Sequence, residues 1–117
     1  MEKDCIFCKM ASGEIPVEKI KETDNFFVIR DKYPLSEGHS LIITKKHYDN
    51  LLHTPSLLGN ELLTLAKEIY LNLAKEIKSE GFNIVQNNFK AAGQAVDHIH
   101  FHIIPRKEND GIKGFSK

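Results

Sequence analysis

The sequence has no net charge and no long apolar run. Sixteen Lys and Arg residues balance sixteen Asp and Glu residues in a chain of 117 residues. No broad electrostatic attraction to nucleic acid or to an anionic membrane is therefore expected. No apolar stretch approaches the length that crosses a bilayer, and residues 1–5 are too polar to begin a secretion signal. We expect a cytoplasmic protein that binds neither nucleic acid nor a membrane.

Cysteine is scarce, since Cys5 and Cys8 are the two cysteines of the chain. Without an export signal, a Cys-x-x-Cys spacing indicates metal binding or redox chemistry before a structural disulfide. No strand is predicted in front of the pair, as a thioredoxin-like redox site would require. Two thiolates and two histidines complete a tetrahedral zinc site, and this interpretation is favoured over a pair of small core residues.

Internal repeats and low-complexity tracts are also absent, and the length suits one domain, residues 1–117. Asp4 is predicted to cap a short helix that ends at Gly13. The predicted strands are residues 19–22, 25–30, 40–44, 82–88 and 96–105. Short strands joined by tight turns around one long helix predict an α+β domain with an antiparallel sheet of about five strands.

The long helix is predicted between Thr54, a good N-cap, and Gly81, which suits the position after the last turn. Pro55 fits the first helical position. Apolar residues recur at helical spacing and should pack on the sheet; they are Leu58, Leu62, Leu65, Ala66, Ile69, Leu73 and Ile77. Residues 106–117 form a charged tail, mobile or lying on a partner.

Three histidines alternate with apolar residues in His98-Ile99-His100-Phe101-His102. On a strand, alternate side chains share a face, so the imidazoles point one way and the apolar side chains point toward the helix. Three interpretations compete: a polar strand face, a metal site, and catalysis with one imidazole as nucleophile. Neighbouring imidazoles repel when all are protonated, which favours neutral forms.

The residues around this motif suit a nucleotide phosphate and its ribose. Gly93 and Gln94 can bring backbone N–H groups and an amide to an anion. His39 lies at the start of the strand predicted at residues 40–44, and Asp31 can accept hydrogen bonds from sugar hydroxyls. These neighbours favour the catalytic interpretation.

Residues 93–104 (GQAVDHIHFHII) resemble the signature of the histidine triad (HIT) superfamily, in which three histidines alternate with apolar residues. Residues 38–47 (GHSLIITKKH) resemble the strand that contributes a supporting histidine, and residues 5–16 resemble the opening of the family. The agreement covers roughly residues 5–106. The resemblance implies a HIT-like fold, a nucleotide hydrolase or transferase acting at the α-phosphate, a purine nucleotide of the AMP or GMP type, and a homodimer.

By position, the resemblance gives the histidines different roles. His100 would be the nucleophile and form a nucleotidyl-histidine that water then cleaves. His102 would contact the phosphate or protonate the leaving group, and His39 would support the triad. The nucleotide would be bound by Asp31 at the ribose, Gln94 at the phosphate, Asn87, Gly93, Ala95 and Val96, and by an apolar base pocket of Ile6, Phe7 and Ile29.

The resemblance also implies a zinc ion, because members with this cysteine pair carry one. Its ligands would match Cys5, Cys8, His47 and His98. The zinc would be closed and structural, and His98 would both bind it and help to fix the nucleophilic neighbour. The metal and catalytic interpretations are then compatible.

The substrate class stays open between nucleoside phosphoramidates and dinucleoside polyphosphates. Ala95 stands where some branches carry Ser or Thr, and Lys32 where an apolar base contact is common. Residues 107–117 lack the Trp-containing ending of the phosphoramidate branch, and residues 103–107 (IIPRK) resemble the polyphosphate branch slightly more. Two further classes are a nucleotide-binding regulatory or adaptor module with vestigial hydrolysis, and a plain zinc-binding module.

Overall fold

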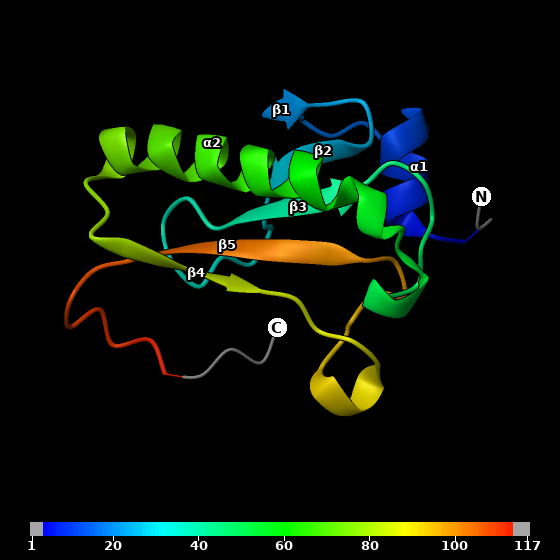
Figure 1. Cartoon of the computed structure of the whole chain (residues 1–117). Helices are drawn as coiled ribbons and strands as arrows, with labels where there is room; N and C mark the ends of the chain where they lie inside the picture. The colour runs from blue at the N-terminus through cyan, green and yellow to red at the C-terminus, as the bar shows by residue number, and fades with distance from the viewer. Residues whose placement is uncertain (1–3, 114–117) are drawn as a thin grey trace.

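The chain is built around a five-stranded antiparallel sheet (Figure 1), in a computed structural model that describes residues 4–113. The strand order is β1-β2-β3-β5-β4, and each neighbouring pair is antiparallel. The strands are Lys21–Glu22 (β1), Phe26–Arg30 (β2), Ser40–Thr44 (β3), Gly81–Val85 (β4) and His100–Arg106 (β5). The helices of the described chain are α1 (Ile6–Ser12) and α2 (Gly59–Ile77). The predicted α+β fold is confirmed.

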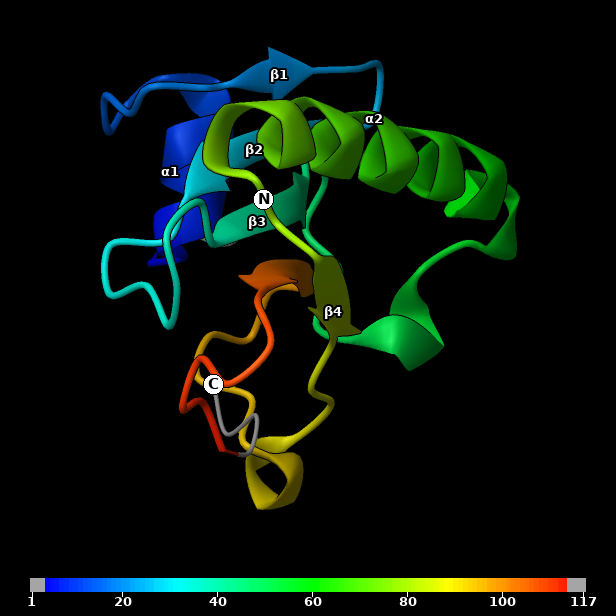
Figure 2. The same cartoon turned by 90° about the vertical axis from the view of Figure 1, so that its left-hand side faces the viewer.

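The two faces of the sheet pack against different helices. α2 runs along one face (Figure 1), and its residues Leu65, Ala66, Ile69 and Leu73 form one core cluster with Phe26, Val28, Ile42, Ile99, Phe101 and Ile103. α1 lies beside β2 and β3 (Figure 2), and its Phe7 forms a second cluster with Phe27, Ile29, Leu41 and Ile43. Because side chains alternate along a strand, β2 and β3 each supply both clusters.

The interior position of β5 places His100 and His102 inside the sheet. β5 pairs with β3 on one side and with β4 on the other, and His100 and His102 are opposite Ile43 and Leu41 of β3. Phe101 and Ile103 belong to the α2 cluster, so alternation directs His100 and His102 to the α1 face. The predicted division between a histidine face and an apolar face that packs on the helix is confirmed for β5.

Several predicted element bounds are wrong. β5 begins at His100 and not at residue 96, so His98 precedes the strand, where its N–H bonds the carbonyl oxygen of Val96. β4 ends at Val85 and not at residue 88, and β1 covers Lys21–Glu22 and not residues 19–22. The α1 cap is Cys5 and not Asp4, because the Cys5 Sγ accepts the N–H of Cys8. Gly13 does end α1, in the left-handed conformation.

The start and end of α2 also differ from the prediction. Two short 3-10 turns, Leu51–His53 and Ser56–Leu58, occupy the predicted beginning, and the α-helix starts at Gly59. The Thr54 hydroxyl bonds the carbonyl oxygen of Asn50 and so does not cap α2. At the other end, Lys78 adopts the left-handed conformation at φ 54°, while Gly81 opens β4. Helices often end with a glycine in the left-handed conformation, but at the end of α2 that position is taken by Lys78.

Arg106 holds the described part of the predicted tail against the sheet. This last residue of β5 donates to Asp110 at 2.7 and 2.9 Å and to Asn83 on β4 at 2.8 Å. The single-domain and tail predictions also include residues 1–3 and 114–117, which lie outside the described residues. Within residues 4–113, no helix has both the length and the apolarity needed to cross a membrane.

Glu61 fastens the first turn of α2 to the turn between β1 and β2, and Glu61→Gln should therefore destabilise the fold. Its carboxylate accepts hydrogen bonds from the Thr23 hydroxyl, the Asn25 backbone N–H and the Asn25 side-chain amide at 2.5–2.9 Å. Burial acts to raise the pKa of Glu61, but these bonds lower it overall. We expect the variant to lose about 1–2 kcal/mol of unfolding free energy near pH 7.

A folded-state pKa below the unfolded one stabilises the protein above the unfolded pKa, and that contribution disappears as the pH falls through the folded pKa. The difference between wild type and variant in urea unfolding should therefore shrink between about pH 7 and about pH 3. Glu76→Gln, an exposed position of the same helix, is the matched control. Equal destabilisation by both substitutions would contradict the role of Glu61.

Candidate active site and metal centre

His98, His100 and His102 are buried on the α1 side of the sheet, with 0, 7 and 4% of their surfaces exposed. The rings of His100 and His102 lie edge to face with centroids 5.1 Å apart. Phe7 of α1 contacts His100 and His98 at centroid distances of 5.1 and 5.7 Å. The three imidazoles therefore lie on one side although His98 is outside the strand.

A backbone contact fixes the proton of His100. The Nδ1 atom lies 2.8 Å from the carbonyl oxygen of His98. Because a carbonyl oxygen only accepts, Nδ1 carries the proton and donates it. Burial lowers the pKa of His100, against the opposing effects of this hydrogen bond and of Asp31. The neutral ring therefore has its lone pair on Nε2, the form required of a nitrogen nucleophile.

The proton positions of His39 and His102 follow from a second backbone contact. The Leu35 N–H donates to His39 Nδ1 at 3.0 Å, which leaves the proton of the neutral His39 ring on Nε2. His39 Nε2 lies 2.9 Å from His102 Nδ1 and donates a hydrogen bond to it. A neutral His102 then carries its own proton on Nε2. Sequence reasoning did not identify Leu35, because the signal is a main-chain N–H.

Asp31 lies next to the same pair. Its Oδ2 is 3.4 Å from His39 Nε2 and 3.8 Å from His102 Nδ1, and 10% of its side chain is exposed. The other oxygen, Oδ1, accepts the N–H of Tyr33 at 2.9 Å. The predicted contact of Asp31 with a ribose stays a prediction, while the structure brings this carboxylate to the histidines.

Cys5, Cys8, His47 and His98 form a second cluster, in which the potential ligand atoms all lie within 4.8 Å of one another. Three sulfur–nitrogen distances to histidine Nδ1 atoms are 3.2, 3.3 and 3.6 Å. Zinc bond lengths in a tetrahedron give a sulfur–nitrogen separation of about 3.5 Å. The sequence prediction of these four residues as one ligand set is thus matched by their geometry.

Hydrogen bonds orient both histidines of this cluster. His47 donates through Nε2 to the Asp49 carboxylate at 2.7 Å, and His98 donates through Nε2 to the Thr44 carbonyl oxygen at 2.7 Å. Both rings therefore direct the lone pair of Nδ1 toward the sulfur atoms, as metal-binding histidines do. Burial lowers the pKa of His98 to about 4, which keeps the ring neutral. Asp49 and Thr44 were not identified from the sequence.

Asp31, His39 and His102 form another cluster whose potential ligand atoms lie within 4.8 Å of one another. The proton positions on its histidine rings differ from those of the Cys and His cluster. His39 accepts a backbone N–H at Nδ1, so binding a metal through Nε2 would leave both ring nitrogens without a proton. An imidazolate of this kind is a costly ligand. The Cys and His cluster fits a metal ion, and the Asp31 cluster fits proton transfer.

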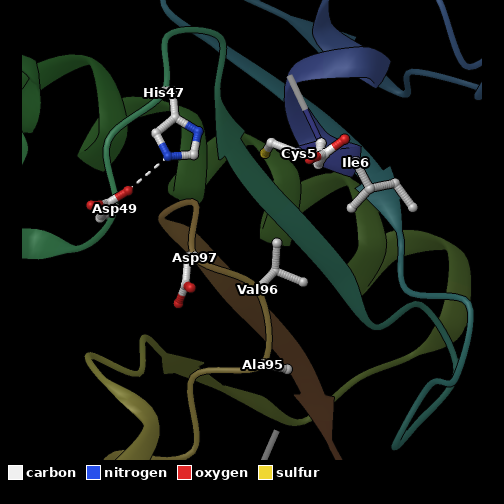
Figure 3. Close-up of a pocket in the computed structure, with 8 residues that line it drawn as sticks. Cys5, Ile6, His47, Asp49, Ala95, Val96 and Asp97 are labelled. Carbon is white, nitrogen blue, oxygen red and sulfur yellow. Dashed lines mark hydrogen bonds and ion pairs between the residues drawn. The ribbon is translucent and has the colours of Figure 1, made fainter. Parts of the chain in front are cut away.

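A pocket of about 450 Å³ opens beside the metal cluster (Figure 3). It is lined by Asp4, Cys5, Ile6, His47, Asp49, Ala95, Val96 and Asp97. Predicted nucleotide-binding residues and predicted metal ligands therefore border one cavity. Ile6 is 43% exposed, whereas Phe7 and Ile29 are buried in the α1 cluster, against which Val96 also packs.

Gln94 is occupied in fixing the loop before His98. Its amide nitrogen donates to the carbonyl oxygens of Asp49 and Val96 at 2.6 and 3.0 Å, and its oxygen accepts the N–H of Phe89 at 2.7 Å. Gly93 turns the same loop at φ 91°, and the Asn87 carbonyl oxygen accepts from Gln86. Contacts of Gln94, Gly93 and Asn87 with a nucleotide stay predictions.

The fold is a five-stranded antiparallel sheet with buried histidines gathered on one face. A family model described as "HIT domain" matches residues 12–109. The chain is 44% identical to adenylylsulfatase HINT3 of Arabidopsis thaliana over 110 residues, which cover 94% of this chain and 56% of that protein. It is also 44% identical to adenosine 5′-monophosphoramidase HNT1 of Saccharomyces cerevisiae over 108 residues, 92% of this chain and 66% of that protein.

The crystal structure of a zinc-bound histidine triad family protein from Mycobacterium smegmatis is similar, with a TM-score of 0.85 and 37% identity, and the match covers 94% of this chain and 80% of that one. The chain belongs to the HIT family. It spans little more than half the length of the Arabidopsis relative and about two thirds of that of the yeast relative.

The contacts of Gln94 predict that Gln94→Ala lowers stability before any nucleotide is added. The substitution leaves the Phe89 N–H and two carbonyl oxygens without this partner, which should cost about 1–3 kcal/mol of unfolding free energy. Chemical denaturation of the nucleotide-free protein measures it, with exposed Lys90→Ala in the same loop as control. A residue that contacts only a phosphate would leave this stability unchanged.

Proposed function

We propose that the chain is a nucleotide hydrolase that cleaves at the α-phosphate of a nucleoside phosphoramidate through a nucleotidyl intermediate on His100. The observation that carries this proposal is the 2.8 Å contact that holds the proton of His100 on Nδ1 and leaves Nε2 nucleophilic. The similarity to an adenosine 5′-monophosphoramidase supports a phosphoramidate of adenosine. This similarity favours phosphoramidates as the substrate class over dinucleoside polyphosphates, although residues 103–107 resemble the polyphosphate branch slightly more.

The reaction would proceed in two displacements. His100 Nε2 attacks the phosphorus atom, the bond from phosphorus to the leaving nitrogen breaks, and the proton on His102 Nε2 passes to that nitrogen. Water then attacks the nucleotidyl-histidine, the bond from phosphorus to Nε2 breaks, and the water proton returns to His102. Two displacements replace one difficult step with two easier ones.

The nucleotide would lie in the cavity beside Ile6, Ala95 and Val96, which border the pocket next to the metal cluster. Asp31 would bind the ribose, and Asn87, Gly93 and Gln94 would contact the phosphate after Gln94 exchanges one of its loop bonds. Phe7 and Ile29 would support the base from the α1 cluster. The ligand would be a purine nucleotide of the AMP or GMP type.

The alternative function is a nucleotide-binding regulatory or adaptor module with vestigial hydrolysis. It shares the nucleotide pocket but does not require the proton positions of His100 and His102. Turnover of adenosine 5′-phosphoramidate by the wild-type protein separates the two functions, because an adaptor would bind AMP without catalysing that reaction.

Replacing the nucleophile should abolish this turnover. We expect His100→Ala to lower kcat by about 10³-fold or more, because no other group can form the covalent intermediate. Rapid-quench mass spectrometry should detect one adenylyl group on the wild-type chain and none on the variant. The matched control is His53→Ala, an exposed histidine that belongs to neither cluster of potential ligands, which should keep its activity. Undiminished turnover by His100→Ala would contradict the assignment.

We further propose that Cys5, Cys8, His47 and His98 hold a structural zinc ion. The donor set, the sulfur–nitrogen distances of 3.2–3.6 Å and the oriented rings support it, as does the zinc-bound relative from Mycobacterium smegmatis. When bound, the ion would supply a rigid link among the N-terminus of α1, His47 and His98. With four protein ligands it would have no open position for substrate.

Removing the carboxylate partner of His47 should weaken zinc binding. Asp49→Ala is expected to lower zinc affinity by about 10- to 100-fold, measured by competition with a chromogenic chelator. Asp97→Ala removes another carboxylate that lines the same pocket but is not in the ligand cluster, and it should leave affinity unchanged. Elemental analysis should find about one zinc ion per wild-type chain. Protein prepared without chelators and found free of zinc would contradict the site.

We also propose a homodimer formed through β4. This strand is at the edge of the sheet, and its Phe82 and Ile84 are 39 and 50% exposed. Ile84 borders an apolar groove of about 300 Å³ together with Leu62 and Leu63 of α2. An edge strand beside exposed apolar surface favours pairing with a second copy.

A cytoplasmic location stays a prediction.

A further inference from the structure

The proton supply of His102 poses a chemical problem that the histidines alone cannot solve. In the neutral pair, His39 donates through Nε2 to His102 Nδ1, and His102 keeps its proton on Nε2. If His102 gave this proton to a leaving group, the proton on His39 Nε2 would move to His102 Nδ1. His39 would then be left as an imidazolate. The pair therefore needs one proton more than two neutral rings carry.

An additional proton changes the contacts between the two rings. With it, His39 Nε2 and His102 Nδ1 both carry hydrogen, and two N–H groups cannot both point into the 2.9 Å gap between these atoms. One of them needs another acceptor. Asp31 Oδ2 lies 3.4 Å from the first nitrogen and 3.8 Å from the second, on a side chain that is 10% exposed.

We propose that Asp31 is a positioning residue for His102. The Asp31 carboxylate orients the His39–His102 pair and balances the charge of the proton that the pair delivers. This role rests on the proposed function and is independent of any contact between Asp31 and a ribose. In the first displacement, the doubly protonated His102 gives its Nε2 proton to the leaving nitrogen and keeps the Nδ1 proton. Asp31 neither gives nor takes a proton in this step, so the protons balance without any further donor.

A substrate without ribose hydroxyls separates this role from sugar binding. We compare wild type with Asp31→Asn on adenosine 5′-phosphoramidate and on 2′,3′-dideoxyadenosine 5′-phosphoramidate. The asparagine oxygen can still accept the Tyr33 N–H, so the turn at Asp31 is kept while the charge is lost. If Asp31 positions His102, kcat should fall by about 10- to 100-fold on both substrates. Affinity for 2′,3′-dideoxyadenosine monophosphate should change less than about twofold.

The contrary result is equally distinct. If Asp31 acts only on the ribose, Asp31→Asn will match wild type on the dideoxy substrate, and the proposal is overturned. Glu37→Gln removes one negative charge from the same loop at an exposed position and should leave both rates unchanged.

Imidazole ¹H–¹⁵N spectra of the wild-type protein provide a measurement that needs neither a folded variant nor turnover. The expected spectrum has His39 protonated at Nε2, the atom that faces Asp31. A His39 protonated only at Nδ1 could not donate to Asp31 and would overturn the proposal. If wild type fails to hydrolyse adenosine 5′-phosphoramidate, the proposed function falls, and these spectra still decide the arrangement of Asp31, His39 and His102.

Discussion

The hydrogen bond from His100 Nδ1 to the carbonyl oxygen of His98 is the interaction on which the rest of the site depends. It selects which nitrogen of the buried ring keeps its lone pair, and it does so through the main chain of a residue whose side chain lies in the Cys and His cluster. His98 is held in turn by Thr44, at the end of β3. The sheet, the cluster and the proposed nucleophile, His100, are therefore connected through a single residue, and a shift of His98 would move the proton acceptor of His100.

Proton positions also explain why two clusters of similar residues suit the different chemistry proposed for each. Both clusters offer at least three potential ligand atoms within 4.8 Å. In one, Asp49 and Thr44 accept from the far nitrogens of the rings, so lone pairs face the cysteines. In the other, the Leu35 N–H donates to His39 and leaves a proton facing Asp31 and His102. Residue types alone would not distinguish a metal site from a proton-transfer site here.

This dependence on partners defines what the sequence could predict. Alternation along residues 98–105 correctly separated Phe101 and Ile103, which pack under α2, from the histidines on the opposite face. The four potential metal ligands were also identified together, through residue type and resemblance. Asp49, Thr44 and Leu35 were missed, because a main-chain group or a lone carboxylate has no sequence signature, and its partner is fixed only by the fold. The predicted start of the last strand was wrong for a related reason. His98 meets the strand's periodicity, but its ring is held by the Thr44 carbonyl oxygen and lies beside the sulfur atoms of Cys5 and Cys8.

Gln94 shows how one residue can meet a sequence pattern and still have a different immediate role. The pattern places an amide near a phosphate, yet the structure uses all of its hydrogen-bonding groups to join Phe89, Asp49 and Val96. Asp49 is the acceptor for His47, so Gln94 also links the loop before the histidine motif to the second ligand histidine. A phosphate that recruited the Gln94 amide would have to break a contact to this segment. If a phosphate binds as proposed, Asp49 would couple it to the geometry of the Cys and His cluster, because its carbonyl oxygen binds Gln94 while its carboxylate binds His47.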